Sequence, residues 1–418
     1  MISLTNIKID NDESNIQIEQ KEEHKIFKIC ITGGPCAGKT SCLVLVSEKL
    51  RDEGFNVFTV PETSTIIANG GGMIQMQTYD DQQSINFQKA LMRSQVQLED
   101  TFYGIAKLSK QKAIILCDRG LMDGSAYLPL NLWNNMLKQM NIDEVQVRDR
   151  RYDCVIHLIT AADGAVQYYN KNNNARHESP QEAICVDRKL QIAWLGHPYF
   201  KLVDNYSVKN FEEKLNKVVT IIRQAVGLPA QLKELHKKFL LDTEFLTPQF
   251  PEDLKVLKFF IEDNFIQHSL YLEGPEHKIY TKVRRRGWLS QYIYIWSQSE
   301  FKNGVIVGKN KRQLNFKEYL FYLQLTDKNR KPLLKQRFCF IWEGLSYVID
   351  TYINIQEGFS TLKVKMQDEN QMCLIPDFLN IKREVTDEKG YKSRFLSKKN
   401  WYIPSGDEDV INFRKESL

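Results

Sequence analysis

The sequence lacks the features expected of a secreted or membrane-spanning protein. None of its eight cysteines forms a C-x-x-C pair or the paired spacing of a zinc site, which argues against a disulfide or structural-zinc framework. No run of about 18 apolar residues exists, so no spanning helix is expected. A basic-then-apolar leader, a myristoylation glycine and a prenylation cysteine are all missing. We therefore expect a cytoplasmic protein whose membrane contact, if it has one, is peripheral on intracellular membranes.

Strong charge of one sign is also missing. The formal net charge is only +5 over 418 residues, which gives no reason to expect a nucleic-acid partner. The length favours two domains rather than one core. We predict a flexible polar tail over residues 1–24, a first domain over 25–228, a second over 233–400 and a C-terminal tail over 401–418.

The first domain alternates short apolar runs with helical patterns. A long amphipathic helix is expected through residues 87–105. Strand–helix alternation with short connections is typical of an α/β domain whose parallel sheet is covered on both faces. The expected strands are 26–32, 55–60, 113–117 and 154–159.

The second domain shows strict alternation of apolar and polar residues in closely spaced runs. This pattern predicts an α+β antiparallel barrel, interrupted by one helix over residues 315–326. A hinge at 227–229 and a short helical segment at 231–236 are expected before it. The expected strands are 280–286, 292–297, 335–343, 347–353 and 361–366.

Residues 33–40 read GGPCAGKT, which satisfies the eight-residue P-loop pattern between an expected strand and an expected helix. Backbone N–H groups of such a loop curve around phosphates, and the helix that follows directs its positive end at them. We expect Lys39 to reach the terminal phosphates and Thr40 to bind Mg²⁺. A chance glycine-rich turn is the alternative. The predicted nucleotide-binding residues of this loop are Gly33, Gly34, Pro35, Cys36, Ala37, Gly38, Lys39, Thr40 and Ser41.

Two acids and an arginine follow the neighbouring strands. Asp118 ends a buried strand, where the second Mg²⁺ residue of a P-loop site is expected; a helix N-cap is the alternative. Arg119 is predicted to reach a phosphate or the acceptor, unless it forms a surface salt bridge. Glu62 follows Pro61 and is the candidate base of a small-molecule kinase; an N-cap or loop acid is the alternative.

Two further arginines, Arg176 and Arg188, lie in a polar segment at 170–189 that we expect to be mobile. Arginines in such a segment can close over a phosphoryl group and would then belong to the nucleotide site. The alternative is a solvated loop with no such role.

Seven cations of the second domain fall on matched strand faces if alternation holds. Directed inward, they would form a cavity that binds polyanions; directed outward, they would be the solvent face of a sheet. The seven residues are Lys282, Arg284, Arg286, Lys335, Arg337, Lys363 and Lys365.

From about residue 25 to about residue 400 the series of motifs resembles the TRPL translocation defect protein 14 family. The resemblance implies a P-loop domain similar to nucleoside and nicotinamide riboside kinases, followed by a CYTH-like triphosphate tunnel. It also implies binding of GTP and phosphoinositide and a role in membrane-protein trafficking. The motifs are residues 33–41, Pro61-Glu62-Thr63, Asp118-Arg119-Gly120, residues 152–161, Gly196-His197-Pro198-Tyr199, residues 312–319 and Pro376-Asp377-Phe378-Leu379.

The sequence departs from CYTH enzymes in its acids. Their opening Glu-x-Glu-x-Lys strand corresponds to residues 233–239, where paired glutamates are absent. Of the remaining candidates Glu343 and Asp350, alternation predicts that only Glu343 shares the basic face. Hydrolysis with two metals needs several carboxylates, so a polyanion binder is expected rather than a hydrolase.

Three functions fit these features. The first is a GTP-binding regulatory protein with Mg²⁺ in its P-loop and a phosphoinositide or other polyphosphate in its barrel. The second is an ATP-dependent small-molecule kinase in which Lys39, Glu62 and Arg119 are catalytic. The third is a tunnel triphosphatase. The residues alone do not choose between GTP and ATP.

Overall fold

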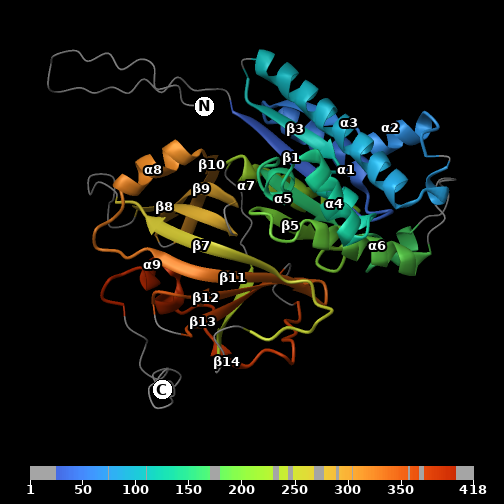
Figure 1. Cartoon of the computed structure of the whole chain (residues 1–418). Coiled ribbons are helices and arrows are strands. Elements are labelled where there is room, and N and C mark those ends of the chain that lie inside the picture. Colours follow the sequence, from blue (N-terminus) through green and yellow to red (C-terminus); the bar gives the residue numbers. More distant parts are fainter. Residues whose placement is uncertain are drawn as a thin grey trace, which may run out of the picture.

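The computed structural model contains two sheets, one parallel and one antiparallel, which confirms the predicted fold class (Figure 1). It describes residues 25–401 except 74, 110, 170–178, 229–234, 243–247, 268–276, 289–290, 304, 356–357 and 367–370. In this part of the chain, no helix is long and apolar enough to cross a membrane.

The first sheet has five parallel strands in the order β2-β3-β1-β4-β5. Four of them confirm the predicted strands. The edge strand β5 was not predicted, because its four residues carry too little pattern. The bounds are β1 Ile26–Gly33, β2 Asn56–Val60, β3 Ala113–Asp118, β4 Cys154–Leu158 and β5 Phe200–Val203.

Helices cover both faces of this sheet. Ile114 and Ile115 are adjacent in β3 but belong to two different apolar clusters, one on each face. Burial on both sides explains why these strands are continuously apolar. The helices are α1 Lys39–Asp52, α2 Thr63–Asn69, α3 Asp81–Leu108, α4 Leu130–Met140, α5 Glu144–Arg148, α6 Pro180–Ala193 and α7 Phe211–Ala225.

The segment at 170–189 differs from the prediction of a mobile loop. Residues 170–178 lie outside the described residues, but α6 begins at Pro180. Ser179 caps this helix and forms a capping box with Glu182. The Ser-Pro-x-Glu sequence is a helix-start signal that explains this boundary.

The second sheet has nine antiparallel strands in the order β10-β9-β8-β7-β11-β12-β13-β6-β14. All five predicted strands are confirmed as β8, β9, β11, β12 and β13. The predicted helix is α8, Phe316–Gln324. The strands are β6 His236–Leu241, β7 Leu257–Phe265, β8 His277–Trp288, β9 Gln291–Lys302, β10 Val305–Leu314, β11 Leu333–Trp342, β12 Leu345–Tyr352, β13 Ser360–Lys365 and β14 Ile381–Glu384.

Two expectations for this domain change. The helical segment expected at 231–236 lies mostly outside the described residues, and its last residue, His236, begins β6 instead. The barrel is not closed by hydrogen bonds among the described residues, because the ladders end at β10 and β14. The sheet is nevertheless curved: β10 contacts α7, and β13 lines a pocket with the same helix.

The sheet face that carries the predicted cations is covered at both ends by other parts of the chain. At one end, Tyr391 and Leu396, from a 3₁₀ turn (Lys389–Tyr391) and α9 (Ser393–Leu396), pack on Leu240 and Tyr352. At the other end, Leu195 of the first domain packs on sheet residues that include Phe259, Ile261 and Val348. The first domain therefore closes one end of the basic face.

Candidate functional site

The predicted phosphate loop lies between β1 and α1, as a P-loop requires. Gly33 ends β1 with φ 148°, and Gly38 has φ 84° directly before α1. A Cβ on Gly38 would lie 2.5 Å from the ring of Phe211 in α7, so only glycine fits there. Residues 33–38 therefore form a tight turn that leads from the end of β1 directly into the N-terminus of α1.

Lys39 lies over this loop. Its Nζ donates to the carbonyl oxygens of Gly33 and Gly34, at 3.0 Å each. Burial and the nearby charge of Arg119 lower the pKa of Lys39 to about 8, although neighbouring acids raise it. These carbonyls are weak partners that a phosphate can replace, so the ammonium is suitably placed for a nucleotide.

Asp118 is suited to bind Mg²⁺, because one of its carboxylate oxygens has no hydrogen-bond partner among the described residues. It is the last residue of β3 and pairs in register with Ile31 of β1, one strand away from the loop. Its Oδ1 is buried without a hydrogen-bond partner among the described residues. A buried carboxylate oxygen without a partner in the protein can bind a metal ion or accept a hydrogen bond from water. Asp118 and the exposed Thr40 hydroxyl would hold Mg²⁺, which would neutralise phosphate charge when bound.

Burial raises the pKa of Asp118 to about 6, despite the opposing effect of Lys39. Because Mg²⁺ binds the ionised carboxylate, Mg²⁺-dependent nucleotide affinity should fall by about tenfold between pH 7 and pH 5. Titration calorimetry at several pH values measures this loss. The Asp118→Asn variant should bind more weakly at pH 7 and show a shallower pH dependence; an unchanged pH dependence in the variant would assign it to another group.

Glu62 and Arg119 form one ion pair at the edge of the loop. The Nε of Arg119 donates to Glu62 Oε1 at 2.7 Å, and one terminal nitrogen donates to the carbonyl of Gly33 at 3.2 Å. Burial would raise the pKa of Glu62, but the charge of Arg119 and their hydrogen bond hold it at about 2. The structure therefore brings these two predicted residues together beside the loop.

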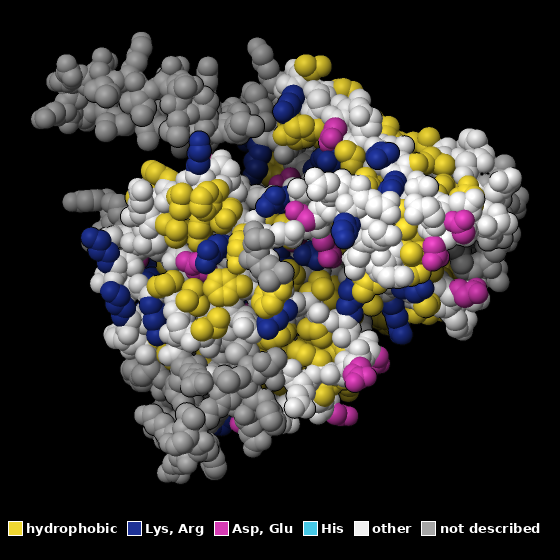
Figure 2. All heavy atoms as spheres, in the orientation of Figure 1, with side chains coloured by type: hydrophobic (Ala, Val, Ile, Leu, Met, Phe, Trp, Pro, Cys, Tyr) yellow, Lys and Arg dark blue, Asp and Glu magenta, His cyan; other side chains and the backbone are white. Residues whose placement is uncertain are grey.

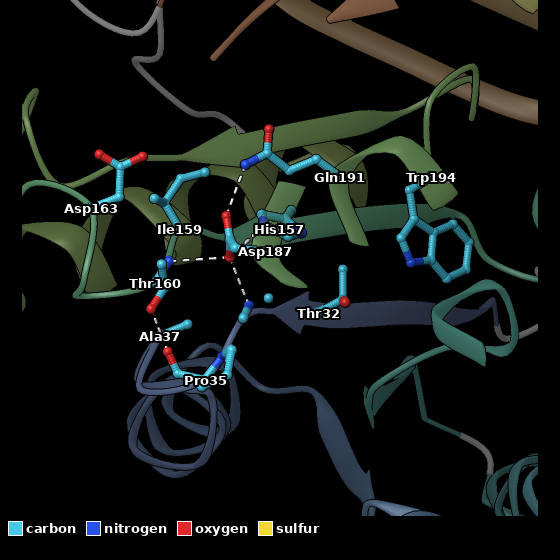
Figure 3. Close-up of polar contacts among 12 residues, drawn as sticks. Thr32, Pro35, Ala37, His157, Ile159, Thr160, Asp163, Asp187, Gln191 and Trp194 are labelled. Atoms are coloured by element: carbon cyan, nitrogen blue, oxygen red, sulfur yellow. Dashed lines mark hydrogen bonds and ion pairs between the residues drawn. The ribbon is translucent and has the colours of Figure 1, made fainter. Parts of the chain in front are cut away.

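Asp187 of α6 anchors the loop at Gly34 and was missed by sequence reasoning (Figure 3). Its carboxylate accepts hydrogen bonds from the backbone N–H groups of Gly34 and Thr160, at 2.8 and 3.2 Å. The side chains of Gln191 and His157 lie at 2.8 and 3.1 Å from its oxygens. Gln191 lies one turn away on α6, but Gly34 belongs to the loop and His157 and Thr160 belong to β4 and the residues after it, so no local signal marks Asp187 as a support of the loop.

Lys214 of α7 is a second missed residue. Its buried Nζ donates to the carbonyl of Ile159 at 2.8 Å and to Asn205 Oδ1 at 2.7 Å. It also reaches the carbonyl of Ala37 in the loop, at 3.5 Å. Lys214 therefore joins α7 to the phosphate loop and to the chain segments that follow β4 and β5.

Of the two arginines predicted to close over a phosphoryl group, only Arg188 lies within the described residues. Arg176 lies outside the described residues. Arg188 is exposed on α6, directly after Asp187, and the helix rather than a loop carries it. A role for either in closing over a phosphate stays a prediction.

The predicted cations of the second sheet share one face. Strand register places Arg337 opposite Asp350, Arg284 opposite Asp263, and Lys363 opposite Val348. Residues directly opposite in neighbouring strands point to the same side. Alternation along β8, β11 and β13 then adds the others, which are Lys282, Arg286, Lys335 and Lys365.

Four of these cations surround two buried acids. Arg284 binds Asp263 through two hydrogen bonds, at 2.6 and 2.8 Å. Arg337 binds Asp350 in the same way, at 2.6 and 2.8 Å. Lys335 lies 2.8 Å from Asp350 and 3.7 Å from Asp263, while Lys282 lies 3.5 Å from Asp263. We call this group of six residues the charge cluster.

The prediction about acids on this face was wrong. Asp350 shares the face, and Glu343 is an exposed turn residue with φ 44°. β11 ends at Trp342 and β12 begins at Leu345, so alternation could not be counted through residues 343 and 344. Asp350 faces inward because its register partner is Arg337.

Arg286 serves a different purpose from the other six cations. Its guanidinium lies 3.2 Å from Asp149 of the first domain and donates to the carbonyl of Gly196. It also lies 3.9 Å from the ring centroid of Phe259. Arg286 is only 4% exposed and joins the domains, so it is placed away from the charge cluster.

Comparison with known protein families finds a match for the first domain. Residues 28–214 match the family model described as "AAA domain". The match spans the predicted phosphate loop, and an AAA-like P-loop domain suggests nucleotide binding. No curated protein is significantly similar to the chain in sequence.

Solved structures similar to the chain include a hypothetical protein, NE1496, and the inorganic triphosphatase NE1496. Both are 19% identical to the chain, with a TM-score of 0.29. The alignments cover 41% and 42% of this chain, and 100% and 98% of the other. At this TM-score the likeness carries no weight for function.

Proposed function

We propose that the chain is a GTP-binding regulatory protein that holds Mg²⁺-nucleotide on residues 33–41 and a phosphate-bearing anion on its second sheet. The observation that carries the first half is the complete loop, with Lys39 above it and an unsatisfied Asp118 oxygen beside it. The guanine preference, the phosphoinositide ligand and a role in membrane-protein trafficking come from the family resemblance.

The Glu62–Arg119 pair favours binding over phosphoryl transfer. A general base works best when its pKa lies near the working pH. With a pKa of about 2 and a direct bond to Arg119, Glu62 would accept a proton poorly. As a small-molecule kinase, the protein would have to separate this pair when the acceptor binds.

The charge cluster favours a polyphosphate binder over a triphosphatase. Asp350 is occupied by Lys335 and Arg337, and Asp263 by Arg284. Carboxylates engaged with cations are poor ligands for the two metals of a hydrolase. Excess positive charge in a partly enclosed site favours anions.

Turnover assays separate these functions. With GTP or ATP and Mg²⁺, we expect release of nucleoside diphosphate that nucleosides and nicotinamide riboside do not increase. Acceptor-dependent release would instead support the kinase. With inorganic tripolyphosphate we expect no metal-dependent phosphate release; release that survives Lys39→Ala would support the triphosphatase.

A further inference from the structure

We propose that a pocket at the junction of the two domains is a separate anion site, which binds a small phosphate-bearing molecule and couples its binding to the phosphate loop through α7. This site goes beyond the proposed function. Its coupling, but not its anion binding, requires that the loop bind nucleotide.

The pocket gathers lysines from both domains. Lys201 of β5 and Lys217 of α7 line it from the first domain, and Lys363 and Lys365 of β13 from the second. None of the described residues that line it is acidic. Its other walls are polar or apolar: Phe200, Leu202, Ile221, Gln224, Leu235, Gly344, Leu345, Ser346 and Met366.

Four like charges around one concave surface attract anions, because their potentials add where solvent is partly excluded. These lysines also have partners within the protein: Lys217 donates to Ser207 Oγ at 2.8 Å, and Lys201 lies 5.4 Å from the ring centroid of Tyr199. The inference therefore rests on their convergence on one pocket. On the face in Figure 2, Lys and Arg side chains lie along the junction of the two lobes together with Asp and Glu side chains.

The pocket is distinct from the charge cluster. Lys363 pairs in register with Val348 of β12, and Lys365 pairs with Ser346. Both partners precede Asp350 in β12, so the two lysines lie nearer the start of this strand than Asp350 does. Asp350 is not among the lining residues, and neither is Asp263. An anion in the pocket would therefore contact the lysine side chains that line it without displacing the ion pairs of either acid.

One helix connects this pocket to the phosphate loop. At the start of α7, the ring of Phe211 lies against Gly38, and Lys214 reaches the carbonyl of Ala37. Farther along the same helix, Lys217, Ile221 and Gln224 line the pocket. Residues 214, 217, 221 and 224 follow the three- and four-residue spacing of a single helix face.

An anion that draws Lys217 toward Lys363 and Lys365 would change the position of α7, and α7 contacts the loop directly. Linkage between two sites requires that each ligand change the affinity of the other by the same factor. We expect nucleotide affinity to change by about tenfold when the pocket is filled, within the usual range of such couplings.

The test uses full-length protein and inorganic tripolyphosphate as the probe. Binding is measured by calorimetry in the Lys39→Ala background, which weakens competing uptake by the phosphate loop. Lys201→Met with Lys365→Met should weaken binding at least about tenfold, since two charges are lost while side-chain length is kept. Lys278→Met with Lys302→Met removes the same charge from exposed strand positions and should have little effect.

Unchanged affinity in the Lys201/Lys365 variant, or equal losses in both double variants, would overturn the pocket. If the double variant fails to fold, Lys365→Met alone serves, with an expected loss of severalfold. Vesicles with and without a phosphorylated inositol lipid form a second arm. If sedimentation with the vesicles requires the phosphorylated lipid as well as Lys201 and Lys365, a lipid headgroup is the source of the phosphate. If the protein binds tripolyphosphate but does not sediment with the vesicles, the ligand is a free phosphate-bearing molecule.

Coupling is tested separately, by titrating Lys39-intact protein with GTP at increasing tripolyphosphate. The coupling is the part of the change in GTP affinity that is lost in the Lys201/Lys365 variant but kept in the Lys278/Lys302 control variant. No such difference would overturn the role of α7. Failure to bind GTP without tripolyphosphate would instead count against the proposed function and leave the anion pocket standing.

Discussion

Lys39→Ala should abolish measurable nucleotide binding, with a loss of at least about 100-fold, while the fold is kept. The ammonium supplies the positive charge over the loop, and a lost charge-assisted contact to phosphate costs about 2–5 kcal/mol. Its partners in the structure are the carbonyls of Gly33 and Gly34. Its removal therefore leaves no directly bonded acid behind, and thermal unfolding should change little.

Lys49→Ala is the matched control, because Lys49 lies on the same helix, near Asn216 and away from the loop. It should bind nucleotide as the wild type does. Calorimetry and circular dichroism on both variants make the comparison. Normal binding by Lys39→Ala would show that residues 33–41 are not the nucleotide site.

Asp263→Asn should have the largest effect on stability, lowering the free energy of unfolding by about 3–5 kcal/mol. Asp263 is fully buried, and Arg284, Lys282 and Lys335 all face it. Burial opposes its ionised form, but these cations hold the pKa of Asp263 well below its usual range. Without the negative charge, three cations would repel one another in a poorly solvated site.

Glu262→Gln is the control for this variant. Glu262 precedes Asp263 in β7, points to the opposite side and pairs with the half-exposed Arg285 at 2.8 Å. Its loss should cost about 1 kcal/mol or less. Denaturant unfolding of both variants measures the difference, and equal small losses would contradict the account of the charge cluster.

The same variant tests anion binding on the sheet. Tripolyphosphate should raise the unfolding temperature of Asp263→Asn more than that of the wild type, because the anion binds the folded state and supplies the missing negative charge. An equal increase in both proteins would place the anion elsewhere. The Lys201/Lys365 variant distinguishes the junction pocket from this cluster.

The sequence predicted features that are contiguous or periodic. The phosphate loop is one run of residues, and the shared face of the cations follows from alternation within β8, β11 and β13. The inward position of Asp350 could not be predicted, because it depends on the register of two strands across a turn that includes Glu343.

Long-range contacts escaped prediction for a similar reason. Asp187 and Lys214 contact the loop from helices more than a hundred residues away along the chain. Arg286 continues the cationic alternation of β8, yet it binds Asp149 because the first domain covers that end of the sheet. Local pattern carries no information about which element covers a strand end.

The most direct test of the proposed function is a pair of calorimetric titrations of the purified protein, with GTP and with ATP, each in the presence of Mg²⁺. The account predicts one site per chain and binding of GTP at least about tenfold tighter than ATP, a difference of about 1.4 kcal/mol. A preference for ATP, or equally weak binding of both nucleotides, would contradict the regulatory function and favour the kinase.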